Sequence, residues 1–138
     1  MVTSKRIQIK SGGNCEIIDI TQEISRTISE SDCKDGIVTV FVAGSTAGVT
    51  TVEYEPGLVS DLQAAFERLA PQGIPYGHDQ RWGDGNGHSH VRASLLGASL
   101  VIPFTAGQPE LGTWQQIVVI DFDNRPRTRP VILQIMGE

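Results

Sequence analysis

The sequence predicts an α+β domain with a largely antiparallel sheet and two helices. Three observations support this: short runs rich in β-branched residues, two segments whose apolar residues recur at helical spacing, and turn residues between most of these segments. A chain of 138 residues is long enough for one domain with a real core and too short for two ordinary ones. We therefore expect a compact single domain over residues 1–138.

Strands are expected where apolar and polar residues alternate or where β-branched residues dominate. These segments are 6–10, 15–20, 37–43, 49–53, 99–104, 114–122 and 130–136. Turn residues at 11–14 and 123–126 predict two hairpins, because each turn joins two consecutive strands. The run 37–43 is expected to be a buried strand, and Pro103 places 99–104 near an edge of the sheet.

Two segments have the pattern of helices. Thr21 can cap a short helix over 21–29, and apolar positions over 58–69 define an amphipathic helix. Asp61 falls on the flank of the apolar face of this second helix, where its side chain can reach a pocket. The stretch 71–87 is too rich in glycine and proline for regular structure, and a long loop in a compact domain is more often functional than idle.

All three histidines of the chain lie in one glycine-rich window, residues 76–97. His88 and His90 are two residues apart and project to the same side if the segment is extended, and His78 can join them from the preceding loop. Three imidazoles, completed by a carboxylate or water, suit zinc or another divalent first-row metal. The alternative is three unrelated histidines exposed to water.

Other polar residues can supply the rest of a site. Ser45 and Thr46 follow a buried strand, where hydroxyls and backbone amides can hold a phosphate or carboxylate; the alternative is an ordinary turn. Glu53 ends a strand and is a candidate general base or metal ligand, or else an exposed glutamate. Gln115 can point into a cleft beside Trp114.

Composition excludes several classes of protein. A net charge of −5 gives no basic surface for general nucleic-acid binding. The only basic cluster, Arg125, Arg127 and Arg129, is expected to be solvated or to pair with acids across a subunit contact. No apolar run approaches the roughly 20 residues that span a bilayer, and the N-terminus lacks the apolar core of a signal peptide. A cytoplasmic protein with no membrane partner is therefore expected.

The two cysteines, Cys15 and Cys33, lie far apart and form no CxxC motif. They indicate free thiols in a reducing compartment, with a single disulfide as the alternative.

Several blocks together resemble the YjbQ-like family. They are Tyr76-x-His78, Asp84-Gly85-Asn86-x-x-x-His90, Ser94-Leu95-x-Gly97-x-Ser99, Ile102-Pro103, Gly107 and Leu111-Gly112-Thr113-Trp114-Gln115. The pattern extends over nearly the whole chain and includes Thr46-Ala47, Glu53 and Asp61. The resemblance implies a compact α+β domain that assembles as a homotrimer, with sites near subunit contacts. It also implies a secondary thiamine-phosphate synthase activity, which joins a hydroxymethylpyrimidine diphosphate to a thiazole phosphate and releases pyrophosphate.

One block departs from the family pattern. The family commonly has His-Thr-[Ser/Thr]-Ala where this chain has Gly44-Ser45-Thr46-Ala47, so the first histidine is missing. His88 is an extra histidine near His90 and is the candidate to supply a third imidazole.

The leading hypothesis is a metal-dependent enzyme that acts on small phosphorylated heterocycles. Its expected metal ligands for zinc or a similar divalent ion are His78, His88 and His90. Its catalytic candidates are Glu53, Asp61 and His90, with either carboxylate as a further ligand or base. Its substrate-binding candidates are Ser45, Thr46, Asn86, Thr113 and Gln115. The alternative is a non-catalytic trimer that binds a small ligand or metal, which the missing histidine favours.

Overall fold

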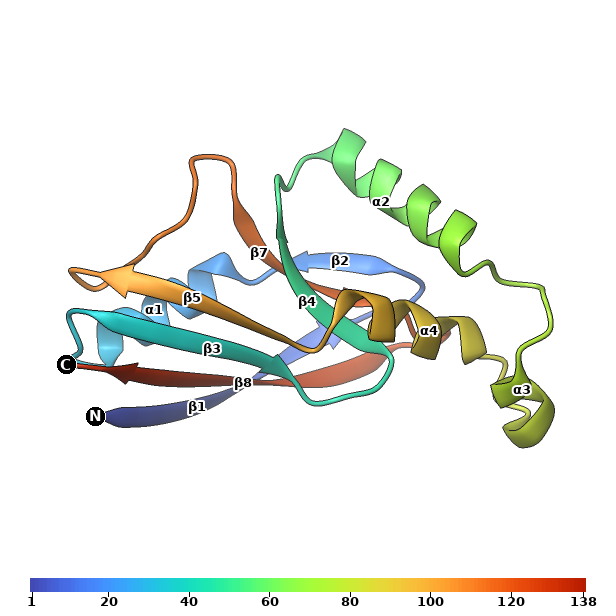
Figure 1. Ribbon diagram of the computed structural model, residues 1–138, viewed down its shortest axis with the longest axis horizontal. Helices are drawn as coiled ribbons and strands as arrows, with labels where there is room; N and C mark the ends of the chain where they lie inside the picture. The colour runs from blue at the N-terminus through green and yellow to red at the C-terminus, as the bar shows by residue number, and fades with distance from the viewer.

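The strands form two antiparallel sheets in a computed structural model that describes residues 1–138 (Figure 1). The five-stranded sheet has the order β1 (Val2–Ser11), β8 (Arg127–Gly137), β3 (Gly36–Val42), β5 (Ser99–Thr105) and β6 (Gln108–Pro109). The three-stranded sheet has the order β2 (Glu16–Asp19), β7 (Gln116–Asp121) and β4 (Ala47–Val52). The α+β class with mostly antiparallel pairing is confirmed.

The main core lies where the inner face of the five-stranded sheet meets one face of the three-stranded sheet and helix α1 (Thr21–Glu30). Strand β3 buries every second residue, as an alternating strand should, and it contributes Val38, Val40 and Val42. Ile24 and Ile28 of α1 are fully buried in the same cluster. The predicted buried strand and the predicted first helix are therefore both present.

The second face of the three-stranded sheet carries a smaller apolar cluster and two more helices. Helix α2 (Pro56–Leu69) contributes Phe66, and helix α4 (Gly87–Leu96) contributes Ala93. Because both faces of this sheet are covered, β7 is buried from Ile117 to Asp121. The amphipathic pattern over 58–69 therefore does correspond to a helix.

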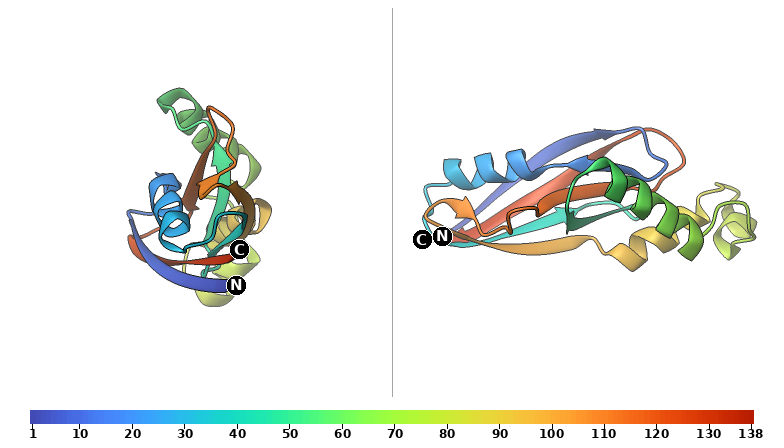
Figure 2. Two further views of the ribbon diagram at one scale, coloured as in Figure 1. Left: turned by 90° about the vertical axis from the view of Figure 1, so that its left-hand side faces the viewer. Right: turned by 90° about the horizontal axis from the view of Figure 1, so that it is seen from above.

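Both termini lie at one end of the molecule, and the short helix α3 (Gly77–Trp82) lies at the other (Figures 1 and 2). Four helices thus replace the two expected, and both additions fall in the glycine-rich window. Their sequences have weak helix propensity, but α4 buries His88, Ser89 and Arg92 as well as Ala93. Tertiary packing overrides local preference here. No helix in the structure is long and apolar enough to cross a membrane.

The two predicted hairpins are wrong. Strand β1 pairs with β8, and β2 pairs with β7, so each turn carries the chain from one sheet to the other. At the first turn Gly13, Asn14 and Cys15 all have positive φ, which redirects the chain away from β1. Thr21 does not cap α1 either, because its hydroxyl donates to Asp19 and accepts from the Ile117 amide.

Candidate functional site

A polar cleft of about 450 Å³ lies at the start of β8. The connection between β3 and β4 and the segments around α3 and α4 complete its walls. Its volume falls in the range of small-molecule sites, yet it is lined almost wholly by polar residues and glycine. The polar side chains are Ser45, Thr46, His78, Asp84, Asn86, His90, Arg127, Thr128 and Arg129.

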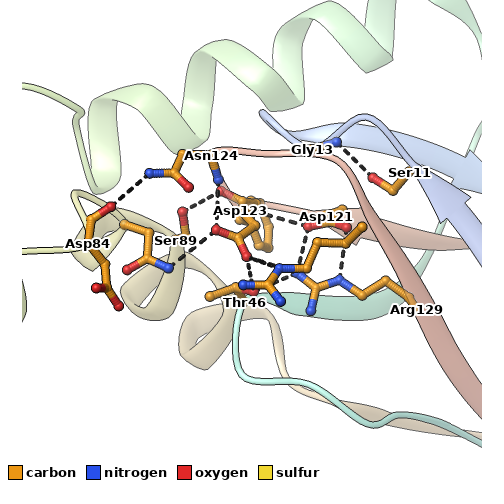
Figure 3. A network of polar contacts seen from close by, with 12 residues as sticks. Ser11, Gly13, Thr46, Asp84, Ser89, Asp121, Asp123, Asn124 and Arg129 are labelled. Atoms are coloured by element: carbon orange, nitrogen blue, oxygen red, sulfur yellow. Dashed lines mark hydrogen bonds and ion pairs between the residues drawn. The ribbon is translucent and has the colours of Figure 1, made fainter.

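Beside the cleft lies a network of charged side chains, and its most buried part is the ion pair between Arg129 and Asp121 (Figure 3). Arg129 donates through Nε and Nη2 to the two carboxylate oxygens of Asp121, at 2.8 Å each. Asp121 is 0% exposed and Arg129 is 5% exposed. Arg129 Nη2 also donates to Thr46 Oγ1, so that a predicted substrate-binding residue is held by the network. Two parallel hydrogen bonds fix the guanidinium plane.

Asp123 is the second buried carboxylate, and it holds three side chains of the cleft in place. It accepts hydrogen bonds from Thr46 Oγ1 at 3.2 Å, from Asn86 Nδ2 at 3.2 Å and from Arg127 Nε. Burial alone would raise its pKa, but hydrogen bonds from the Asn124 amide, Asn86 and Arg127 outweigh burial and lower that pKa. Asp123 is therefore ionised at neutral pH, and its charge orients these donors.

The imidazoles of His78 and His90 lie side by side in the cleft, with ring centroids 4.3 Å apart. Burial, followed by the neighbouring His78, lowers the pKa of His90. His78 Nδ1 and Asn86 Oδ1 are buried without a hydrogen-bond partner. Asn86 is 6% exposed, so this free acceptor atom is an uncompensated cost unless a ligand meets it.

His88 lies away from this pair. Residues two apart on a helix point about 200° from each other, so the same-side projection expected for an extended segment does not occur. His88 is 4% exposed, with its ring 6.4 Å from that of Tyr76 and its Nε2 3.3 Å from Ser89 Oγ. Within one chain no three His, Cys, Asp or Glu side chains lie close enough to share a metal ion.

His88 belongs instead to the packing that fixes α4. Arg92, 2% exposed, donates to the Ala70 carbonyl at 2.9 Å and to Glu67 at 2.6 Å, which joins α4 to the end of α2. The Gly87 amide donates to Asp79 Oδ1 at 2.8 Å, so α3 caps the start of α4. These contacts position His90 and Asn86.

Four predicted residues lie elsewhere in the chain. Glu53, Asp61, Thr113 and Gln115 are exposed and do not line the cleft. Glu53 follows β4 and Thr46 precedes it, so the two lie at opposite ends of that strand (Figure 1). Gln115 donates to Thr51 Oγ1 at 2.9 Å near the Glu53 end. The structure therefore divides the predicted site into two parts.

The charged network of two aspartates and two arginines was not predicted from the sequence, although the sequence contains a signal for it. Asp121 and Asp123 stand two residues apart before the turn, and Arg127 and Arg129 stand two residues apart after it. Equal spacing of opposite charges around one turn indicates pairing across it, rather than the solvated or intersubunit arginines that were expected. Asp84 also lines the cleft and was not assigned a role.

A second hollow of about 320 Å³ continues from the cleft and shares Gly44, Ser45 and His90 with it. Its remaining lining residues are small: Ala47, Ala93, Ser94, Gly97 and Ala98. A ligand that spans both spaces would meet charged groups at one end and small apolar groups at the other.

Comparison with known proteins identifies relatives over the full length of the chain. The profile of a family described as UPF0047 protein YjbQ-like matches residues 5–138. A UPF0047 protein of Archaeoglobus fulgidus is 38% identical over 130 residues, which cover 94% of this chain and 98% of the relative. A UPF0047 protein of Bacillus subtilis is 33% identical over 135 residues, 96% of this chain and 98% of the relative.

Solved structures agree with this match. A YbjQ-like protein of unknown function from Sulfolobus solfataricus has a TM-score of 0.90 at 30% identity, with 100% of both chains covered. A hypothetical protein from Aeropyrum pernix has a TM-score of 0.91 at 31% identity, with 99% of both chains covered.

Proposed function

This chain belongs to the YjbQ-like UPF0047 family, and on that premise we propose that its cleft binds a small phosphorylated molecule. One observation carries the proposal. Arg127 and Arg129 line a polar cleft, and buried carboxylates hold each guanidinium by some of its nitrogens, leaving other N–H groups for a ligand. Preorganised guanidinium groups are well suited to phosphate oxygens.

We further propose that the chain acts as an enzyme of the secondary thiamine-phosphate synthase type. In this reaction a thiazole ring nitrogen forms a C–N bond to the methylene carbon of the pyrimidine, and the C–O bond to pyrophosphate breaks. The nucleophile is an uncharged nitrogen without a proton to lose, so the step needs charge stabilisation of the leaving group more than a general base. The two guanidiniums would stabilise the leaving group through directed, charge-assisted hydrogen bonds, and the hollow beside Ala47 and Ala93 has room for a ring.

The proposal retains a divalent metal ion, but with two histidine ligands from this chain instead of the three that were predicted. His78 and His90 supply two adjacent imidazoles, and Asn86 Oδ1 is a free oxygen donor in the same cleft. His88 does not fit as the third ligand, because it lies away from the other two histidines. We assign His78 and His90 as the protein ligands of a zinc-like ion, whose other ligands would come from water, substrate or a second copy of the chain.

We propose a homotrimer in which a neighbouring copy completes the site. Glu53, Asp61, Thr113 and Gln115 lie outside the cleft of their own chain, which is expected if they serve the cleft of another. The outer face of the five-stranded sheet is a candidate contact surface. Its exposed apolar residues are Val2, Ile37, Phe41, Val101 and Met136, and Val2, Met136 and Ile37 stand in register across β1, β8 and β3.

The alternative function is non-catalytic: a trimer that binds a small ligand or metal. The observation that favours it is that neither predicted catalytic carboxylate, Glu53 or Asp61, lines the cleft of its own chain. Cys15 and Cys33 are free and buried, which fits the cytoplasmic location proposed for either function.

Turnover separates the two functions. The protein is incubated with the pyrimidine diphosphate and the thiazole phosphate, and pyrophosphate release and thiamine phosphate formation are measured. The enzyme is expected to form both products in equal amounts, and Arg127→Gln is expected to abolish this while Arg26→Gln, an exposed control on α1, retains it. Thermal stabilisation by these ligands without any product would support the binding protein instead.

A further inference from the structure

Gly44 stands directly against the buried guanidinium of Arg129. A Cβ atom built on Gly44 would lie 2.8 Å from Arg129 Nη1, closer than real contacts of this kind allow. The φ angle of Gly44 is outside the left-handed region, so the backbone does not require glycine here. In this chain, the contact with Arg129 and not the backbone conformation disfavours a side chain at position 44. Glycine leaves an opening through which the cleft reaches Nη1.

Arg129 Nη1 is the one nitrogen of this guanidinium that the network leaves free. Nε and Nη2 donate to Asp121, and Nη2 also donates to Thr46. Because the side chain is only 6% exposed and is held by these hydrogen bonds, Nη1 cannot swing away to find another partner. Nη1 lies beside Gly44, and both residues line the cleft.

Arg127 provides a second set of free donors at the same wall. Its Nε donates to Asp123, and its two terminal nitrogens make no hydrogen bond within the chain. The side chain is 35% exposed, so these nitrogens are accessible. An oxyanion that accepts several hydrogen bonds can therefore meet donors from both arginines without reorganising either.

The directed N–H donors of Arg127 and Arg129, and not a net positive charge, would make this wall of the cleft select phosphate over a monatomic anion. Three carboxylates, Asp84, Asp121 and Asp123, accompany the two guanidiniums, so the surroundings carry no positive excess when the histidines are neutral. A monatomic anion gains little at such a place. A phosphate group gains several charge-assisted hydrogen bonds.

We propose that Gly44 is the specificity-determining position of the cleft, because it admits a phosphate group to Arg129 Nη1 and Arg127 without a bridging metal ion. This inference rests on the proposed function, which supplies the phosphorylated ligand. It goes further in naming the atoms that bind the phosphate and in making that binding independent of any metal at His78 and His90.

The test measures binding of inorganic phosphate by calorimetry, in the presence of a chelator, to wild-type protein and three variants. Gly44→Ala is expected to weaken binding at least about tenfold, because its methyl group covers Nη1. Arg127→Gln removes the second donor set from a partly exposed side chain and is expected to weaken binding similarly. Arg26→Gln, an exposed position on α1 that does not line the cleft, is the matched control for the loss of a guanidinium and is expected to bind as the wild type does.

The outcomes of this experiment distinguish failure of the Gly44 proposal from failure of the proposed function. Tight binding by Gly44→Ala, or wild-type binding that appears only after a divalent metal is added, would overturn the role of Gly44 while leaving the proposed function intact. If the wild type binds neither phosphate nor any phosphate ester with or without metal, both proposals are wrong. If Gly44→Ala does not fold, the Arg127→Gln result alone decides, because unchanged binding there removes the two-arginine phosphate site.

Discussion

Arg129 and Asp121 join the two sheets of the molecule through a buried pair of parallel hydrogen bonds, both 2.8 Å long. Arg129 belongs to β8 of the larger sheet, and Asp121 ends β7 of the smaller one. The same pair therefore holds the two sheets together at the turn between β7 and β8. It also leaves one guanidinium nitrogen of Arg129 free beside the cleft. Fold stability and the proposed ligand binding therefore depend on the same contact.

Asp121→Asn is expected to destabilise the fold strongly. It removes the charge that compensates a buried guanidinium, and breaking such a pair from one side costs about 3–5 kcal/mol. Equilibrium unfolding in urea measures the change. The exposed pair Lys5–Glu30, with side chains 44% and 57% exposed, is the control, and Glu30→Gln should cost less than about 1 kcal/mol. Equal effects of the two changes would show that the buried pair has no special role.

Arg92→Met is expected to loosen α4 from α2. The change leaves the Ala70 carbonyl without its donor, and an unsatisfied buried group costs about 1–3 kcal/mol. Glu67→Gln should matter less, because half of the Glu67 side chain is exposed and water can replace its partner. Hydrogen exchange of the α4 amides provides the measurement. If Arg92→Met leaves exchange in α4 unchanged, the Arg92 contacts do not hold that helix.

The stability of the fold is expected to fall as the pH drops below about 6.5. Burial, and then the positive charge of Arg92, lowers the pKa of His88; burial, and then His78, lowers that of His90. The unfolded chain therefore binds these protons at a higher pH than the folded chain does. The stability that neutral histidines contribute is complete above the unfolded pKa and is lost as the pH falls toward the folded values.

Urea midpoints at a series of pH values between 8 and 5 check this prediction, with His88→Gln as the comparison. The variant should show a shallower decline over that range than the wild type, because one of the two imidazoles whose pKa is lowered in the folded chain is no longer present. A wild-type curve that rises toward acid would contradict the sign.

Much of the fold was predictable because its strongest patterns are local. The β-branched run of β3 and the apolar spacing of α2 each specify their element without help from distant residues. The hairpins failed for a physical reason: turn residues show that the chain reverses, but not whether the next strand joins the same sheet. Helix α4 was hidden because its stability comes from burying residues such as Ser89 and Arg92, a tertiary effect.

The candidate site also has one part that was predictable from sequence and one part that was not. His78, His90, Asn86, Ser45 and Thr46 were predicted, and the structure brings them to one cleft. The arginines were not assigned to it, because their role depends on two sheets meeting at one turn. The position of His88 depends on the helical conformation of α4, and the two-residue spacing from His90 alone could not predict that position.

Mixing two inactive variants is expected to restore activity if a neighbouring copy completes the cleft. Arg127→Gln disables the cleft, and Glu53→Gln disables the exposed loop region that we propose serves another chain. In randomly mixed trimers a cleft from one variant can face a loop from the other, so roughly one site in four has both parts intact. Either variant alone has no such site.

The variants are unfolded together, refolded and assayed, and each variant refolded alone is the control. Recovery of about a quarter of wild-type activity in the mixture supports a shared site, since no single chain in it carries both functional residues. Glu53→Gln that is fully active alone would remove Glu53 from the reaction. If Glu53→Gln is inactive and the mixture is inactive as well, the two parts must act within one chain. Because Glu53 and the cleft stand at opposite ends of β4, that outcome would require the chain to rearrange when substrate binds.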